Sequence, residues 1–313
     1  MSGGSGPWLT VVGSTMIDQI SYLERMPGRG ETVLGRRFAQ GFGGKGANQA
    51  VMASRMGARV AMVNSLGDDG YGTETLANFE RHGVDTTHVR RVAGASGVAP
   101  IWVEPDGSNR IIIVPGANAG LLPEHATEAV RAQERVDVVI GQFEIDQGVT
   151  AAAFEAARAR GAITVLNPAP GAAIDPALAA VSDWVIPNEH ELAIIAGELG
   201  LPDDVGPTAL PRVAELLGTR LLVTLGEHGA ALVGADRTVT SIPAPRVDVV
   251  DTTGAGDAFV GAFGYALGSG WAEADAVRLA CAVASESVRR PGTQASFPDA
   301  DRCRAIIEEV AGT

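Results

Sequence analysis

The sequence has very few cysteines, only Cys281 and Cys303 among 313 residues. Two cysteines cannot build a disulfide framework or a set of zinc ligands, and their scarcity suits the reducing cytoplasm, where we expect this protein to be located. No uninterrupted apolar run approaches about 18 residues, so no membrane-spanning helix and no membrane partner are expected. The start, MSGGSGPW, lacks the basic and apolar regions of a signal peptide, and residues 1–7 are predicted to be a flexible leader.

Basic residues are also scarce, because 24 lysines and arginines are outnumbered by 37 aspartates and glutamates. The net charge is -13 and the isoelectric point is near 4.8. No basic stripe is present to neutralise a phosphate backbone, which argues against a nucleic-acid partner, and we interpret the acidity as a source of solubility. Hydrophobic residues make up 46% of the chain, which is enough for one large core.

Apolar segments alternate with alanine-rich segments along most of the chain. The apolar runs have the near-continuous character of buried parallel strands, and they are 8–13, 59–67, 136–141, 162–168, 183–188 and 220–226. The alanine-rich segments have helical patterns, and they include 45–57, 71–82, 148–160 and 188–199. This alternation predicts an α/β fold with an open, mostly parallel central sheet and helices on both faces.

Two segments interrupt the alternation. Residues 15–42 contain short strand-like pieces where a helix is expected, and residues 95–115 are typical of a β-hairpin around the turn DGSN. We expect these segments to form a small β-sheet lid over the C-terminal edge of the main sheet, within a single domain spanning residues 1–313. Pro100 lies inside the hairpin, and because proline cannot donate a ladder hydrogen bond, its strand is predicted to be an edge strand.

A glycine-rich segment, DTTGAGDAFVGAF, occupies residues 251–263. The apolar residues that follow the glycines have helical spacing, and they are Phe259, Ala262, Phe263, Ala266 and Leu267. A helix is therefore predicted to begin at residues 254–256. Its free N–H groups and the positive end of its dipole would attract an anion such as phosphate without any lysine.

Asp257 follows in the first turn of this predicted helix. A carboxylate there is either a helix-stabilising charge, which is the commoner case for this residue type, or a general base beside a phosphate. The adjoining glycines favour the base, because a static anion site gains nothing from a repelling carboxylate. Phosphoryl transfer to a hydroxyl, in contrast, needs a carboxylate that orients and deprotonates the nucleophile.

A second glycine-rich segment, GFGGKGANQA at residues 41–50, formally matches the dinucleotide-binding pattern G-x-G-x-x-G. It follows the irregular insertion rather than the first strand, so an NAD-dependent oxidoreductase is the least favoured hypothesis. A P-loop does not fit either, because Ala39 and Gly46 stand where a glycine and a hydroxyl residue belong. A plain turn before a helix would explain the glycines, whereas Lys45 and Asn48 indicate polar contacts to a hydroxylated ligand.

Together the two glycine-rich segments resemble the signatures of the ribokinase-like family of carbohydrate and nucleoside kinases. The resemblance extends from Val12 to about Pro298 and includes GAN at 116–118, the PNEHE segment and the tail RRPGTQASFP. It implies an ATP-dependent kinase that transfers phosphate to the 5-hydroxyl of D-ribose. It also implies that the base is Asp257 and that the backbone of Gly254, Ala255 and Gly256 forms the anion hole for the transferring phosphoryl group.

The resemblance also assigns residues to the two substrates. With Asp257, the residues implied to contact the sugar are Asp18, Gly43, Gly44, Lys45, Asn48 and Glu144. Those implied to bind ATP are Asn188, Glu191, Thr224, Gly226, Gly229 and Gly256. Mg²⁺ is expected to be bound mainly by phosphates and water. Asn188 and Glu191 would look the same if they only formed a helix capping box.

A potassium site and a dimer are implied as well. The K⁺ ligands implied by the resemblance are Asp251, Thr253, Ser287, Arg290, Gly292 and Ser296, with Arg290 acting through its carbonyl. The alternative is that Asp251 only caps the helix and that residues 285–296 form a surface turn. The family resemblance and the exposed edges of a projecting sheet lead us to expect a homodimer through the lid.

Met16 departs from the family pattern, in which an asparagine commonly contributes to the sugar site at this position. A thioether is a weak hydrogen-bond partner, so another group contacts the sugar or the acceptor differs. Some members, notably eukaryotic ones, also have methionine there, which keeps ribose as the first choice. The alternatives are a nucleoside or other sugar kinase and, in a different class, a non-catalytic sugar or nucleotide sensor.

Overall fold

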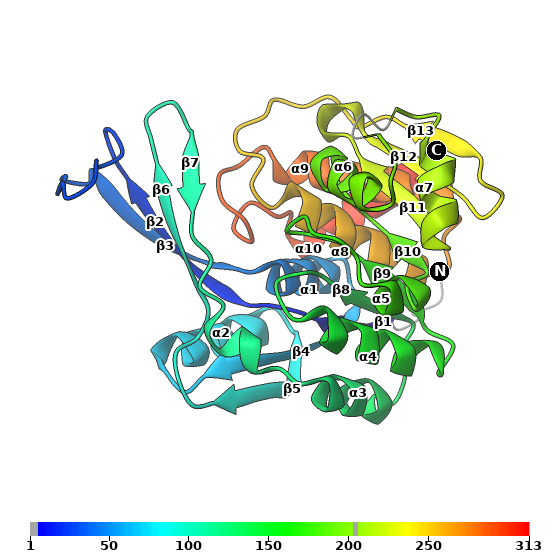
Figure 1. The fold of residues 1–313 in the computed structure, drawn as a ribbon, viewed down its shortest axis with the longest axis horizontal. Helices are drawn as coiled ribbons and strands as arrows, with labels where there is room; N and C mark the ends of the chain where they lie inside the picture. Colours follow the sequence, from blue (N-terminus) through cyan, green and yellow to red (C-terminus); the bar gives the residue numbers. More distant parts are fainter. Residues whose placement is uncertain (1–5, 203–205, 313) are drawn as a thin grey trace.

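A nine-stranded sheet forms the centre of the molecule in the computed structural model, which describes residues 6–202 and 206–312 (Figure 1). Its strand order is β13-β12-β11-β10-β9-β8-β1-β4-β5. The parallel strands are β1 (Trp8–Val12), β4 (Arg59–Gly67), β5 (Asp85–Val92), β8 (Val138–Gly141), β9 (Ile163–Leu166), β10 (Trp184–Val185) and β11 (Arg220–Thr224). The antiparallel strands at one edge are β12 (Ala230–Val233) and β13 (Val239–Ile242).

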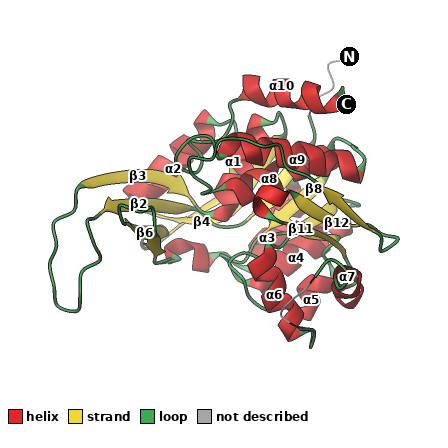
Figure 2. Ribbon diagram, turned by 90° about the horizontal axis from the view of Figure 1, so that it is seen from above, coloured by secondary structure: helices red, strands yellow, loops and turns green. Residues whose placement is uncertain are grey.

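Helices cover both faces of this sheet (Figure 2). One layer contains α1 (Lys45–Arg55), α2 (Gly70–Arg81), α8 (Ala255–Gly268), α9 (Glu273–Ser287) and α10 (Ala300–Ala311). The other contains α3 (Pro123–Ala132), α4 (Gln147–Arg158), α5 (Pro176–Ala180), α6 (Glu189–Glu198) and α7 (Leu210–Leu217). Each layer has its own apolar core, so neighbouring strand residues such as Val11 and Val12 are buried on opposite faces. The predicted fold class is therefore confirmed.

A separate four-stranded sheet projects from one end of the main sheet (Figures 1 and 2). It contains β2 (Met16–Tyr22), β3 (Arg37–Gly43), β6 (Val98–Val103) and β7 (Asn109–Ile111), in the order β3-β2-β6-β7. The pairs β2–β3 and β6–β7 are antiparallel, whereas β2 and β6 run parallel. The two insertions thus form one small sheet, as predicted, and its action as a lid stays a prediction.

The prediction that Pro100 lies on an edge strand is wrong, because β6 lies between β2 and β7. The Pro100 carbonyl accepts a hydrogen bond from the N–H of Ile112 at 3.0 Å. In a strand, the nitrogen and carbonyl of one residue face the same neighbour, so the missing donor also faces the chain just beyond β7. The proline is therefore tolerated on this inner strand, because the hydrogen bond that it cannot donate would be directed beyond the end of β7.

The predicted flexible leader also needs correction. Residues 1–5 lie outside the described part of the chain, but Pro7 is buried and its carbonyl accepts a hydrogen bond from the N–H of Arg59 at 2.9 Å. Pro7 therefore belongs to the folded chain, next to β1 and β4. None of the helices in residues 6–202 and 206–312 has the length and apolar character needed to span a membrane.

Candidate active site

Polar side chains gather where the parallel strands end. Ser14 follows β1, Glu144 follows β8, Asn167 follows β9, Asn188 follows β10, and Thr224 is the last residue of β11. The carboxyl ends of parallel strands meet at one edge of the sheet, which is where open α/β folds bind their ligands. Residues that are far apart in the sequence are therefore brought to the same edge of the sheet.

Helix α8 begins at this edge with the glycine-rich segment. Gly254 is its N-cap with φ 79°, a left-handed conformation that favours glycine, and the helix starts at Ala255 as predicted. Asp257 lies in the first turn and is 7% exposed. The Ala255 N–H donates to the Thr252 carbonyl at 3.2 Å, so this N–H would have to leave that bond before it could contact a phosphate.

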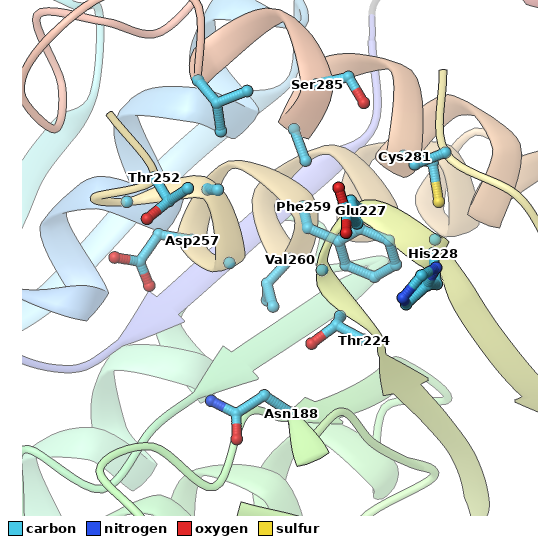
Figure 3. Close-up of a pocket in the computed structure, with 18 of the residues that line it drawn as sticks. Asn188, Thr224, Glu227, His228, Thr252, Asp257, Phe259, Val260, Cys281 and Ser285 are labelled. Atoms are coloured by element: carbon cyan, nitrogen blue, oxygen red, sulfur yellow. The ribbon is translucent and has the colours of Figure 1, made fainter. Parts of the chain in front are cut away.

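A cavity of about 1320 Å³ extends from Asp257 along the sheet edge (Figure 3). All of the residues that the sequence assigned to ATP line it, and they are Asn188, Glu191, Thr224, Gly226, Gly229 and Gly256. Sequence reasoning missed several other lining residues, among them His228, Phe259, Val260, Cys281 and Ser285. The spacing of Cys281 and Ser285, four residues apart on α9, could have placed them on one helix face.

Asn188 and Glu191 form the capping box that the sequence left as an alternative. The Asn188 side chain accepts from the Glu191 N–H at 2.8 Å, and the Glu191 carboxylate accepts from the Asn188 N–H at 2.9 Å. Burial raises the pKa of Glu191 although this hydrogen bond and Lys45 oppose the shift. Both residues also line the cavity, so capping does not exclude contact with a nucleotide.

Asp18 and Glu144, together with Asp257, form an acidic cluster beside the base of the small sheet. Burial, followed by the negative charge of Glu144, raises the pKa of Asp18 to about 7. The Glu144 carboxylate accepts from the N–H of Lys45 at 2.8 Å and from the hydroxyl of Ser14. Gly43 faces Asp18 so closely that a Cβ there would lie 2.4 Å from a carboxylate oxygen.

Lys45 is the cation among these carboxylates. Burial opposes its charge, but Asp257, Glu144 and Glu191 together outweigh burial, and its pKa is raised. The neighbouring Gly44 is the N-cap of α1 with φ 88°. The predicted sugar residues thus lie around one cluster of charges, while their contact with a sugar stays a prediction.

Asn48 and Gln49 hold the carboxylate of Asp257 from α1. The Asn48 amide donates to Oδ2 of Asp257 at 2.9 Å, and the Gln49 amide donates to Oδ1 at 3.0 Å. The sequence indicated Asn48 as a ligand contact, but it gave no signal for Gln49. An amide in an alanine-rich helix has no spacing signature that reveals a partner 208 residues away.

The two segments of the predicted cation site lie together. The Asp251 carboxylate accepts from the Thr253 N–H at 2.9 Å and from the Gly292 N–H at 2.8 Å. The hydroxyls of Ser287 and Ser296 donate to backbone carbonyls at 2.8 Å. The Arg290 side chain forms an ion pair with Glu286, and its backbone carbonyl stays the predicted ligand. Adjacency is shown, whereas binding of K⁺ stays a prediction.

An open α/β sheet with a cavity at its strand ends and a buried carboxylate at a helix start provides a ligand site and a candidate base for phosphoryl transfer. A family model described as pfkB family carbohydrate kinase matches residues 8–300. The chain therefore belongs to the pfkB family of carbohydrate kinases and is an ATP-dependent sugar kinase, which confirms the resemblance found in the sequence.

Relatives and a solved structure resemble the chain over nearly its whole length. A deoxyribokinase from Salmonella typhi is 39% identical over 298 residues, covering 94% of this chain and 96% of that protein. A ribokinase from Mus musculus is 38% identical over 300 residues, covering 93% and 91%. A solved structure of Arabidopsis thaliana ribokinase complexed with ribose and ATP is 32% identical, with a TM-score of 0.87, and covers 97% of this chain and 99% of that chain.

The raised pKa of Asp18 predicts a pH-dependent affinity for the sugar. Because this pKa lies at about 7, the group is protonated below that pH and a carboxylate above it. A carboxylate accepts hydrogen bonds from hydroxyls more strongly than a neutral acid does. The KM for the sugar should therefore fall as the pH rises from about 6 to about 8, as measured by steady-state kinetics with saturating ATP.

The Asp18→Asn variant is the control, because it cannot titrate. Its KM for the sugar should be higher and should lose the inflection near pH 7. An unchanged inflection in this variant would assign the titration to another group.

Proposed function

We propose that this kinase transfers the γ-phosphoryl group of ATP to the 5-hydroxyl of a free pentose, with D-ribose as the first acceptor. The observation that carries the proposal is the position of Asp257, which lines the nucleotide cavity at the start of α8 and is close to Asp18 and Glu144. Asp257 takes the proton of the hydroxyl, whose oxygen forms a bond to the γ-phosphorus. The bond between that phosphorus and the bridging oxygen then breaks, and ADP leaves.

The backbone at the start of α8 stabilises the transferring phosphoryl group in this proposal. The donors are the N–H groups of Gly254 and Gly256, and that of Ala255 once it leaves the Thr252 carbonyl, reinforced by the helix dipole. Mg²⁺ would be held mainly by the phosphates and water, with Asn188 and Glu191 helping to organise it.

A 2-deoxypentose is the second candidate acceptor, and Met16 favours it. Met16 and Asp18 are two residues apart on β2, so both side chains lie on one face of the strand. The Met16 side chain is buried and its sulfur lies 3.8 Å from the Asn118 amide nitrogen. A thioether contributes little to binding a hydroxyl, so a sugar that lacks one loses little here. The similarity to a deoxyribokinase supports the same candidate.

Comparison of acceptors tests this proposal. We expect D-ribose and 2-deoxy-D-ribose to stimulate ADP release far more than adenosine or fructose does. The Met16→Asn variant should raise the ratio of kcat/KM for ribose over deoxyribose by about tenfold, the value of one hydrogen bond to a hydroxyl. An unchanged ratio would show that Met16 does not contact the sugar, and preference for adenosine would favour a nucleoside kinase.

Replacement of the proposed base tests the mechanism. The Asp257→Asn variant should retain binding of ATP and sugar while kcat falls by about 10²–10⁴-fold, the usual contribution of a positioned general base. Asp18→Ala is the matched variant from the sugar side and should lower kcat/KM for the sugar with little change in the KM for ATP. Near-normal turnover of Asp257→Asn would remove it from the mechanism. Nucleotide binding by the unaltered protein without turnover of any sugar would favour a sensor.

We further propose that K⁺ binds between residues 251–253 and 287–296. The Asp251 carboxylate, the Thr253 and Ser287 oxygens and the carbonyl of Arg290 supply hard oxygen ligands from two segments that already touch. A cation here would fix the loop that precedes the anion hole. The kinase should therefore be faster in K⁺ than in Na⁺ at equal ionic strength and constant Mg²⁺. Equal rates in K⁺, Na⁺ and a bulky organic cation would contradict the site.

The small sheet supports a proposed homodimer. It exposes large apolar side chains, among them Phe38 at 62% and Ile111 at 51%. We expect a dimer in sedimentation velocity and a shift toward monomer in Ile111→Lys. Val239→Lys is the control, because Val239 is an exposed apolar residue of β13 at the far edge of the main sheet. A monomeric unaltered protein at micromolar concentration would contradict this proposal.

A further inference from the structure

A chain of side chains connects a surface arginine to the carboxylate of Asp257. The Arg81 guanidinium donates to Oδ1 of Asn78 at 3.1 Å, and the Asn78 amide donates to Oε1 of Gln294 at 2.9 Å. The Gln294 amide donates to Oδ1 of Asn48 at 3.0 Å, and the Asn48 amide donates to Oδ2 of Asp257 at 2.9 Å. Asn48, Asn78 and Gln294 are only 3%, 4% and 5% exposed.

The two ends of this chain determine the orientation of every amide within it. A guanidinium can only donate hydrogen bonds and a carboxylate can only accept them. Each amide presents an oxygen on one side and an NH₂ group on the other, so the donor at Arg81 turns every NH₂ toward Asp257. The Asp257 carboxylate, which can only accept, also requires the NH₂ group of Asn48 to face it. All four hydrogen bonds are therefore mutually consistent.

The other oxygen of Asp257 has a second directed chain. Gln49 donates to Oδ1 of Asp257 and to Oδ1 of Asn167 at 3.1 Å. The Asn167 amide donates to the carbonyl of Ile186 at 2.9 Å, and a carbonyl can only accept. The Gln142 amide donates to Oε1 of Gln49 at 2.6 Å, which leaves the Gln49 NH₂ for the two acceptors. Each oxygen of the Asp257 carboxylate thus accepts from an amide whose orientation is set by its other hydrogen bonds.

We propose that Asn78 and Gln294 are positioning residues that hold the Asp257 carboxylate in its reactive orientation through Asn48. The inference rests on the proposed role of Asp257 as the base. Neither residue needs to touch a substrate, since each acts through the next amide. Asn78 lies on α2 and Gln294 lies in the segment between α9 and α10, so two elements outside the glycine-rich motifs control the angle of the base.

The Asn78→Asp variant tests the direction of the chain with almost no change in side-chain shape. The new carboxylate still accepts from Arg81, but it cannot donate to Gln294. Gln294 then turns its NH₂ toward position 78, Asn48 turns its NH₂ toward Gln294, and an amide oxygen faces Oδ2 of Asp257. We expect kcat to fall about tenfold, the effect of losing one buried hydrogen bond. The KM for ATP should change little, whereas the melting temperature should fall, because a buried carboxylate replaces an amide.

A double-mutant cycle separates reorientation from the field of the added charge. Gln294→Met removes the amide that transmits the reorientation while it keeps an unbranched side chain of similar length. Asn78→Asp should therefore cause no further loss of kcat in the Gln294→Met background, so the two effects should not add. Gln133→Glu, an amide-to-carboxylate change on the far helical layer next to α3, is the control and should have the kcat of the unaltered protein.

The outcomes distinguish this inference from the proposed function. An unchanged kcat for Asn78→Asp, or equal losses in both backgrounds, would overturn the positioning chain even if Asp257→Asn is inactive. Full activity of Asp257→Asn would instead overturn the role of Asp257 as the base, and the positioning inference with it. A loss of kcat in Asn78→Asp would then have another cause. A kcat loss confined to the background that retains Gln294, with Asp257→Asn inactive, supports both.

Discussion

Burial of the Asp257 carboxylate at the start of α8 is the constraint on which the rest of the site depends. A charge removed from water is stable only if it is paired or hydrogen-bonded. Here Lys45 lies nearby, the helix dipole is favourable, and Asn48 and Gln49 each donate to one oxygen. These donors reach Asp257 because α1 and α8 pack closely. A Cβ at Gly261 would lie 2.7 Å from the Gln49 carbonyl oxygen, so this position needs a glycine.

Asp257 lies where two differently built regions meet. The cavity beside Asp257 is lined by the loops after β9, β10 and β11 and by α8 and α9, and it offers amides, glycine backbone and apolar surface. The acidic cluster around Asp18 and Glu144 forms where the small sheet joins the main one and suits a ligand with several hydroxyls. In the proposed mechanism, this position would place Asp257 between the nucleotide and the hydroxylated acceptor, as phosphoryl transfer requires.

The sequence predicted the elements that have a strong local signal. The continuous apolar run 59–67 coincides with β4, and the helical stripe after the glycines correctly placed the start of α8. β5 was missed because DTTHVRRV is mostly polar, as an exposed edge strand can be. The residues that the motifs assigned to ATP, together with Asp257, line one cavity, while their contact with a nucleotide stays a prediction. The motifs could not reveal Gln142 or Gln294, because partners 93 and 246 residues apart become neighbours only through tertiary folding.

The central claim is that this site transfers phosphate to the primary hydroxyl of a pentose, with Asp257 as the base. The most direct measurement is the proton-coupled ³¹P NMR spectrum of the product formed from ribose or deoxyribose and ATP. A phosphate on the primary hydroxyl couples to the two protons of one methylene carbon, and we predict this pattern for the product. Coupling to the single anomeric proton, or release of inorganic phosphate alone, would contradict the account.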